Sequence, residues 1–314
     1  MPIGVLLAVL SYSIYSIGDS IIKGFGTGTL SAFELNFIIS LFSLSALPFA
    51  RATGDRWRDV FEMRRPVLMH LRAMLFTGAQ LFFTIAVTRI PFAETYSLAF
   101  LAPLFLTLLS VLLLKESVSI TRWLLVAASF VGVLIVVRPG FQQLGIGHLS
   151  IIACAFCAAT SNAVLRIMSS SKSGSEKQLS ILAIGSAYQL VVTGVLMVIA
   201  GFVMPAPFEL LRLAFVGLLA GAAQLLAVRA LQLSPASHIG PTHYVQMLWV
   251  VVLGALFYQE TQDAIGYGGL ALIVVAGIAT VFSDGAQARI SGRWIEYRAR
   301  RGEAAITPSE GPEV

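Results

Sequence analysis

The chain has 314 residues, of which 57% are hydrophobic and only 12% are charged, and its mean hydropathy is +0.84. Soluble domains carry about a quarter charged residues, so this composition excludes an ordinary soluble domain. A net charge of +5 would suggest a nucleic-acid partner for a soluble protein, but here the positions of the charges matter more than their sum. We expect the lipid bilayer, and not nucleic acid, to surround this chain.

The apolar residues form ten stretches, each about as long as the roughly 20 helical residues that span a bilayer core. In chain order they are 3–22, 31–50, 67–88, 92–114, 120–137, 147–168, 178–200, 208–231, 236–258 and 264–282. Each stretch is apolar on all sides, and the polar chain between them is too short to cover such helices. The sequence therefore predicts an all-α membrane protein with ten transmembrane helices.

The second half of the chain repeats the first at a shift of 144 residues. Ala79-Gln80-Leu81 returns as Ala223-Gln224-Leu225, and Glu116 returns as Glu260. Because five helices per repeat is an odd number, the two repeats must have opposite orientations in the membrane, an arrangement typical of secondary transporters. We predict two inverted five-helix repeats at 1–140 and 141–283. A basic cytoplasmic tail follows at 284–314, either disordered or forming a short interfacial helix.

The distribution of Lys and Arg predicts the orientation. Seventeen of the 21 Lys and Arg residues flank the even-to-odd joints between stretches or follow the tenth stretch. The positive-inside rule then places both termini in the cytoplasm. The first stretch lacks the basic start and cleavage-like end of a signal peptide, so we expect it to be retained as a helix. No G-x-x-x-x-G-K-[ST] motif is present, so transport would be downhill or driven by an ion or solute gradient.

The stretch 236–258 is the richest in polar side chains. A polar and aromatic stripe follows the helical spacing, with His238, Thr242, Gln246 and Trp249 in line and His243 and Tyr244 beside them. Such a stripe should face a watery cavity, where the aromatic rings could stack on a planar or cationic solute. Hydrogen bonding between helices is the alternative. The two histidines are five residues apart, a poor geometry for one metal ion, and we expect neither a metal nor a cofactor.

Further polar side chains lie at membrane depth in other stretches. Gln80 and Gln224 are repeat mates, and Asn162 belongs to the sixth stretch. We take these three as candidate substrate-binding residues, although ties between helices would explain the two glutamines equally well. Asp19 and Lys23 are four residues apart on one helix face, so their spacing favours an ion pair within that helix.

Glu94 and His238 occupy equivalent positions in the two repeats. Two titratable groups, one reached from each side, could bind and release a proton in turn. Alternatively, Glu94 is a carboxylate stabilised by the dipole at a helix N-terminus. Asp19 is the rival candidate for coupling. Glu116 and Glu260 end their stretches, and we expect each to accept hydrogen bonds from the first amides of the next helix.

Several short motifs, found in both halves of the chain, resemble those of a known transporter family. In the first half they are Pro91-Phe92-Ala93-Glu94, Pro103, Leu114-Lys115-Glu116, Arg122-Trp123 and Gly132 to Gly140, and in the second half Tyr244, Gln246, Trp249, Gly254 and Glu260. The sequence resembles the EamA family of the drug/metabolite transporter superfamily over about residues 1–283, and within it the branch of S-adenosylmethionine uptake carriers. The resemblance implies a ten-helix carrier with a central cavity formed by spans 1, 3, 4, 6, 8 and 9.

The sequence therefore predicts a secondary transporter that moves a small amphipathic metabolite across the bacterial inner membrane by alternating access. A lipid flippase or exporter is the alternative within the same class. A membrane-embedded enzyme is the alternative from a different class. It would need a clustered nucleophile, base and oxyanion site, whereas the His and Glu residues here are spread over several stretches, so we expect no enzymatic activity.

Overall fold

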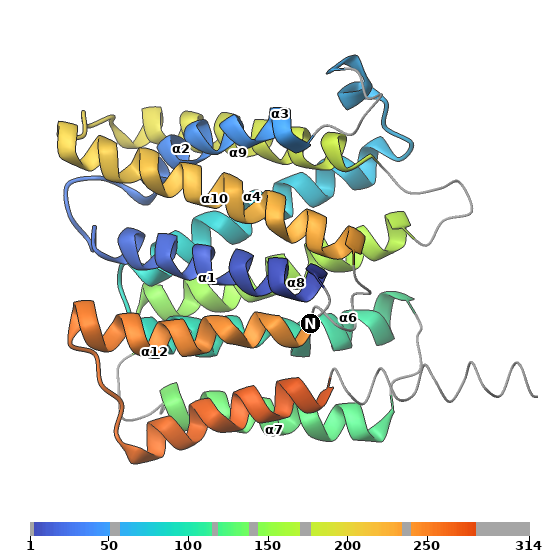
Figure 1. Cartoon of the computed structure of the whole chain (residues 1–314), viewed down its shortest axis with the longest axis vertical. Coiled ribbons are helices and arrows are strands. Elements are labelled where there is room, and N and C mark those ends of the chain that lie inside the picture. The colour runs from blue at the N-terminus through green and yellow to red at the C-terminus, as the bar shows by residue number, and fades with distance from the viewer. Residues whose placement is uncertain are drawn as a thin grey trace, which may run out of the picture.

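The computed structural model describes residues 3–50, 57–114, 119–137, 144–169, 177–233 and 240–280, and every regular element within these ranges is a helix (Figure 1). The first half contains α1 (Ile3–Lys23), α2 (Ala32–Ser43), η1 (Leu44–Ala46), α3 (Leu47–Ala50), η2 (Trp57–Phe61), α4 (Pro66–Val87), α5 (Phe92–Ala99), α6 (Ala102–Leu114) and α7 (Ile120–Val137). The second half contains α8 (Ile146–Ser169), α9 (Gln178–Ala200), α10 (Pro207–Leu233), η3 (Gly240–Tyr244), α12 (Val245–Tyr258) and a last helix, Ala264–Thr280.

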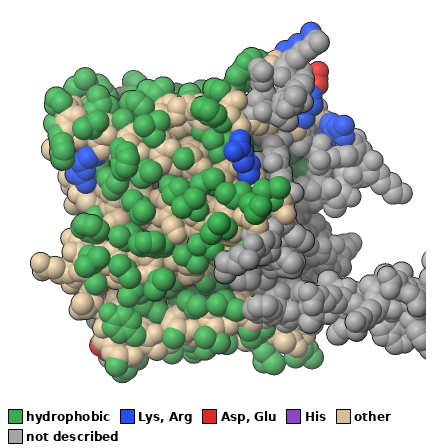
Figure 2. All heavy atoms as spheres, in the orientation of Figure 1, with side chains coloured by type: hydrophobic (Ala, Val, Ile, Leu, Met, Phe, Trp, Pro, Cys, Tyr) green, Lys and Arg blue, Asp and Glu red, His purple; other side chains and the backbone are tan. Residues whose placement is uncertain are grey.

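Among the described residues, seven helical segments are long and apolar enough to cross a membrane, where Ala32–Ala50 and Phe92–Leu109 each count as one segment. Three shorter helices, Trp123–Val137, Thr242–Tyr258 and Ala264–Thr280, are also apolar. Figure 2 shows hydrophobic side chains spread across the whole described surface in view, with few charged ones among them. Water-soluble monomers do not expose apolar surface on this scale. The described part of the chain is therefore all-helical and has several helices suited to span a membrane, and the helix ends agree with the predicted stretches to within two residues wherever both are described.

The helices lie roughly parallel and are stacked in rows along the long axis of the molecule (Figure 1). From one end of this view to the other, the rows hold α2 and α9, α4 and α10, α1 and α8, α6 and α12, and α7 and the last helix, where the two helices of a row overlap in projection. Each row combines one helix of the first half with one of the second. The strongest packing joins neighbouring rows, with α4 against α8 and α1 against α10.

The segment 92–114 is helical in two pieces. Helix α5 ends at Ala99, and α6 begins at Ala102. Pro103 explains the break, because it has no amide proton to donate to the carbonyl oxygen of Ala99, four residues earlier. Broken helices at membrane depth are tolerated where they border a cavity, so this break predicts where a cavity should lie.

The segment 240–258 is also irregular. It starts as the 3-10 helix η3 and becomes α-helical at Val245. Thr242 and Gln246 therefore do not lie on one continuous α-helix, and the single stripe predicted for 236–258 is wrong in this respect. His238 lies outside the described residues.

Small residues allow two helices at one end of the bundle to touch. Gly132 of α7 faces Gly269 of the last helix, and a Cβ atom on either glycine would lie 2.8–2.9 Å from the carbonyl oxygen of the other. Only glycine permits so close an approach of two helix backbones. A similar contact joins α10 to α2, where a Cβ atom on Gly217 would lie 2.6 Å from the carbonyl oxygen of Ile39.

Candidate functional site

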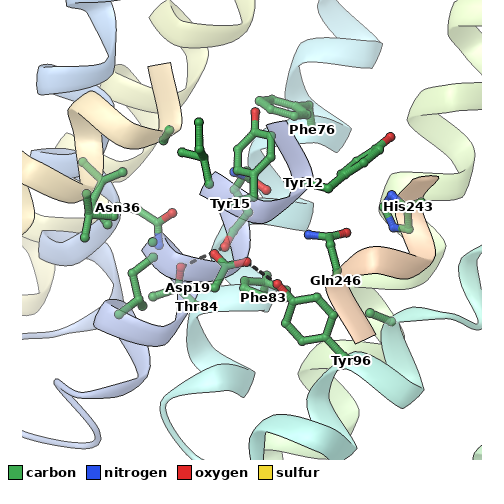
Figure 3. A pocket seen from close by; sticks show the side chains of 18 of the residues that line it. Tyr12, Tyr15, Asp19, Asn36, Phe76, Phe83, Thr84, Tyr96, His243 and Gln246 are labelled. Atoms are coloured by element: carbon green, nitrogen blue, oxygen red, sulfur yellow. Dashed lines mark hydrogen bonds between the residues drawn. The ribbon is translucent and has the colours of Figure 1, made fainter. Parts of the chain in front are cut away.

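A cavity of about 310 Å³ lies among helices of both halves, and we call it the central cavity (Figure 3). Residues of α1, α2, α4 and α5 line it from the first half, and residues of α9, α10, η3 and α12 line it from the second. Aromatic rings and neutral polar groups form much of its wall, namely Tyr12, Tyr15, Phe76, Phe83, Tyr96, Phe100, Asn36, Gln80, Thr84, Gln189 and Gln246. Such a wall suits a solute with both apolar and polar parts.

Helix α1 places an acidic group on this wall. Tyr12, Tyr15 and Asp19 are spaced by three and four residues, so they share one helix face. The carboxylate of Asp19 accepts a hydrogen bond of 2.5 Å from the hydroxyl of Tyr96 in α5 (Figure 3). Sequence analysis missed the two α1 tyrosines as lining residues, although their spacing from Asp19 could have indicated them. A carboxylate at membrane depth usually marks a functional site.

A cluster of aromatic side chains lies between the central cavity and a second cavity. The rings of Tyr12 and Phe100 each meet the ring of His243 edge to face, at centroid distances of 4.6 and 5.4 Å. Phe100 also stacks on Tyr244, its repeat mate, at 5.0 Å. The second cavity, of about 500 Å³, shares Tyr12, Phe100 and His243 with the central one. These four side chains, the ring cluster, therefore form part of the wall between two hollow spaces.

The structure places five of the predicted binding residues at the two cavities. Gln80, His243 and Gln246 line the central cavity. Asn162 and Tyr244 line the second cavity. His243 and Tyr244 are neighbours in η3 and both belong to the ring cluster, so this short helix contributes to both cavities.

The other three predicted binding residues do not line either cavity. The indole Nε1 of Trp249 donates a hydrogen bond of 2.7 Å to the hydroxyl of Ser13, which ties α12 to α1. Gln224 lies beside Ser43 in a small hollow where α10 packs against the first half. Thr242 is buried. Substrate-binding roles for these three residues stay predictions.

The ends of α1, α5 and α12 meet in an ionic contact that we call the Lys23–Glu260 junction. The ammonium group of Lys23 lies 2.8 Å from one oxygen of Glu260 and donates to the carbonyl oxygen of Ile90 at 2.9 Å. The other oxygen of Glu260 accepts the amide of Phe92, the first residue of α5, at 2.6 Å. The predicted Lys23–Asp19 pair is therefore wrong, because the acidic partner of Lys23 is Glu260, just after the end of α12.

The prediction that Glu260 caps the next helix is also wrong. It accepts from the start of α5, which belongs to the other half of the chain, whereas Asp263 accepts from the amide of Gly266 in the last helix at 2.9 Å. The last helix thus has a cap of its own, and Glu260 remains available to join the two halves. Its repeat mate Glu116 lies outside the described residues.

Glu94 lies in the first turn of α5, is only 4% exposed, and does not line the central cavity. One of its oxygens is 3.2 Å from Nε2 of His148, near the start of α8. Nδ1 of His148 accepts the amide of Gly145 at 3.1 Å, so its proton lies on Nε2 and is donated to Glu94. Sequence analysis missed His148, since no spacing rule connects residues on different helices.

Comparison with known proteins gives matches over most of the chain. The S-adenosylmethionine uptake transporter of Rickettsia prowazekii is 25% identical over 285 residues, which cover 90% of this chain and 93% of that protein. The pseudopaline exporter of Pseudomonas aeruginosa is 28% identical over 283 residues, or 88% and 95%. The riboflavin transporter of Vibrio cholerae is 24% identical over 200 residues, or 63% and 65%. These relatives point to a transporter rather than an enzyme.

A solved crystal structure shares the fold, with a TM-score of 0.63 at 18% identity over 91% of this chain and 98% of that chain. The model of the EamA-like transporter family matches residues 2–138 and again residues 145–283. Both matches together cover nearly the whole chain, which confirms the resemblance seen in the motifs. The chain belongs to the EamA-like transporter family.

Proposed function

We propose that this chain is a secondary transporter that moves a small amphipathic metabolite across the bacterial inner membrane by alternating access. The central cavity is the observation that carries the proposal, because helices of both halves that are apolar enough to cross a membrane line it. Its volume of about 310 Å³ lies at the small end of the range for ligand pockets. Rings and amide groups on its wall suit a solute that is apolar in one part and polar in another.

We further propose ten transmembrane helices in two inverted repeats, at 1–140 and 141–283, followed by a cytoplasmic tail at 284–314. The two matches of the family model support this division. The packing supports it as well. Exchanging each helix for its counterpart in the other half turns the α1–α10 contact into the α8–α4 contact, and both are present. Inverted repeats of this kind can rock against each other around a fixed site.

The orientation, with both termini in the cytoplasm, rests on the distribution of Lys and Arg. Single cysteines introduced at Gln142 or Gln262 should react with a membrane-impermeant maleimide from outside the cell, whereas cysteines at Ser173 or Ser291 should not. The native Cys154 and Cys157 are free thiols and need replacement by alanine beforehand. Labelling of position 173 from outside would overturn the orientation.

Transport itself is tested in proteoliposomes. A thermal-shift screen first selects metabolites that raise the melting temperature, with S-adenosylmethionine and riboflavin among them. Counterflow then measures whether unlabelled metabolite inside drives uptake of labelled metabolite from outside. This assay detects exchange whether the protein is an importer or an exporter in the cell. We expect exchange of at least one compound. Scrambling of labelled phospholipid without metabolite exchange would favour the flippase alternative, and absence of both activities would contradict the proposal.

For energy coupling we propose protons, with Glu94 and its repeat mate His238 as the groups that bind and release them and with Asp19 as the rival. Burial of Glu94 beside a titratable partner supports a role beyond helix capping. Cargo binding is assigned first to Gln80, His243 and Gln246 on the central cavity, and then to Tyr244 and Asn162 on the second cavity.

A further inference from the structure

We propose that the central cavity contains a cation subsite at Asp19, so that the cargo carries an ammonium or sulfonium group. This inference rests on the proposed transport function and deepens it by naming the charge of the solute.

The wall of the central cavity has an unbalanced charge. Among its described lining residues, Asp19 is the carboxylate, and neither Lys nor Arg is present. Lys23, one turn further along α1, is held by Glu260 and by the carbonyl oxygen of Ile90. Arg72 lies one turn before the lining residue Phe76 but does not line the cavity itself. Among the described lining residues, a solute in the cavity therefore meets the carboxylate of Asp19 without a Lys or Arg beside it.

The partner of Asp19 does not remove that charge. The Tyr96 hydroxyl donates to one carboxylate oxygen, and a hydroxyl is neutral. A hydrogen bond of this kind orients the carboxylate and lowers the cost of holding it at membrane depth, but a cation would offset that cost far better. In surroundings of low polarity the attraction between opposite charges is much stronger than in water. An anionic solute would be repelled for the same reason.

Aromatic rings around Asp19 favour the same kind of ligand. Tyr15 stands on the same face of α1, and Phe83 and Tyr96 meet edge to face at 5.8 Å on the other side (Figure 3). The faces of aromatic rings carry partial negative charge and attract cations, above all quaternary ammonium and sulfonium groups, because these are only weakly hydrated. The amides of Asn36, Gln80 and Gln246 on the wall can then bind the uncharged part of the cargo.

The experiment compares ligands that differ in one positive charge. The first pair is S-adenosylmethionine, a sulfonium, and S-adenosylhomocysteine, the thioether without the extra methyl group. The second pair is choline and its neutral isostere 3,3-dimethylbutan-1-ol. Binding to the purified wild-type protein is measured by calorimetry for all four compounds. We expect the cation to bind at least tenfold more tightly than its neutral analogue in one or both pairs.

Variants then assign the preference to a residue. Asp19→Asn should reduce the preference for the cation to less than twofold while leaving the affinity for the neutral analogue unchanged. Glu209→Gln is the matched control, because Glu209 is a carboxylate at the start of α10 that accepts the amide of Ala206 and does not line the central cavity. It should keep the wild-type preference. Asp19→Glu, which retains the charge, should keep part of it.

The outcomes separate this inference from the transport proposal. If the wild type prefers the cation in neither pair, the cation subsite is wrong, and this result needs no variant that folds. If Asp19→Asn keeps the preference, the subsite lies elsewhere and the inference is also wrong. Exchange of some other metabolite in counterflow would in both cases leave the transport proposal standing. A protein that exchanges no metabolite would contradict the transport proposal itself.

Discussion

Two regions of the molecule treat charge in opposite ways, although they are one helical turn apart on α1. In the Lys23–Glu260 junction, an ammonium group meets a carboxylate. The ammonium group also donates to the carbonyl oxygen of Ile90, and the carboxylate also accepts from the amide of Phe92. In the central cavity, Asp19 has only a neutral hydroxyl as its hydrogen-bond partner among the described residues. Charges that are paired inside the protein hold helix ends together. A charge that faces a cavity is available to a ligand.

The largest effect should come from breaking the Lys23–Glu260 junction. The two side chains are only 10% and 21% exposed, so Glu260→Gln leaves Lys23 buried without an opposite charge. Removing one partner of a buried pair costs about 3–5 kcal/mol, and we expect the lower part of this range because exposure to solvent is not negligible here. Melting of the detergent-solubilised protein measures the loss. The double variant Lys23→Met/Glu260→Gln should recover more than half of it. Melting of Glu260→Gln at the wild-type temperature would show that the junction contributes little.

Glu94 differs from both regions, because its partner is a histidine, His148, which is charged only when it is protonated. One coupled proton under a gradient of one pH unit supports about tenfold accumulation of solute. We expect Glu94→Gln to remove this accumulation and to spare counterflow exchange, which moves no net proton. His148→Gln, which keeps Glu94, should retain accumulation, and Asp19→Asn serves as the control for the rival coupling residue. An unchanged pH profile of transport by Glu94→Gln would mean that Glu94 is only a helix-end carboxylate.

A smaller effect should separate two residues of α12 that lie three positions apart. Trp249→Phe removes the indole donor to Ser13 and should lower the free energy of unfolding by about 1 kcal/mol with little change in ligand affinity. Gln246→Ala should lower ligand affinity with little change in the free energy of unfolding, because Gln246 lines the central cavity. Melting curves and calorimetric titration of both variants check the distinction. A loss of affinity in Trp249→Phe alone would show that the ring, and not the amide, contacts the cargo.

The smallest effect concerns the repeat mates Gln80 and Gln224. Gln80 lines the central cavity, whereas Gln224 lies in the small hollow between α10 and the first half. Gln80→Ala should weaken cargo binding by a few-fold, as expected for one hydrogen bond of about 1 kcal/mol, and leave the melting temperature unchanged. Gln224→Ala should instead shift only the melting temperature. If both variants behave alike, position in the repeat decides their role and the cavity does not.

The helices could be predicted closely because the bilayer sets their length, and the apolar stretches report that length directly. The break between α5 and α6 was not predicted, although Pro103 supplies its cause and was visible in the sequence. Charge partners were predicted poorly. Spacing along a helix suggested Asp19 for Lys23, but the actual partner, Glu260, follows the end of α12, more than 200 residues later in the chain.

The candidate site shows the same limit. Gln80, His243 and Gln246 could be selected as polar residues in apolar stretches, and all three line the central cavity. Phe76 and Phe83 could not, because an aromatic residue that faces a cavity looks in sequence like one that faces lipid. Only the packing of α4 against its neighbours distinguishes the two cases.

The contact between Gly132 and Gly269 has a consequence for how the protein is synthesised. Helix α7 leaves the ribosome well before the last helix, yet its glycine lies against a residue 137 positions later in the chain. Until that partner is inserted, the groove at Gly132 has only lipid beside it, and lipid tails fill a notch between small residues poorly. A methyl group at either glycine would meet the backbone of the other helix. We therefore expect Gly132→Ala and Gly269→Ala to reduce the yield of inserted, folded protein during biogenesis, while molecules that complete assembly bind their cargo normally.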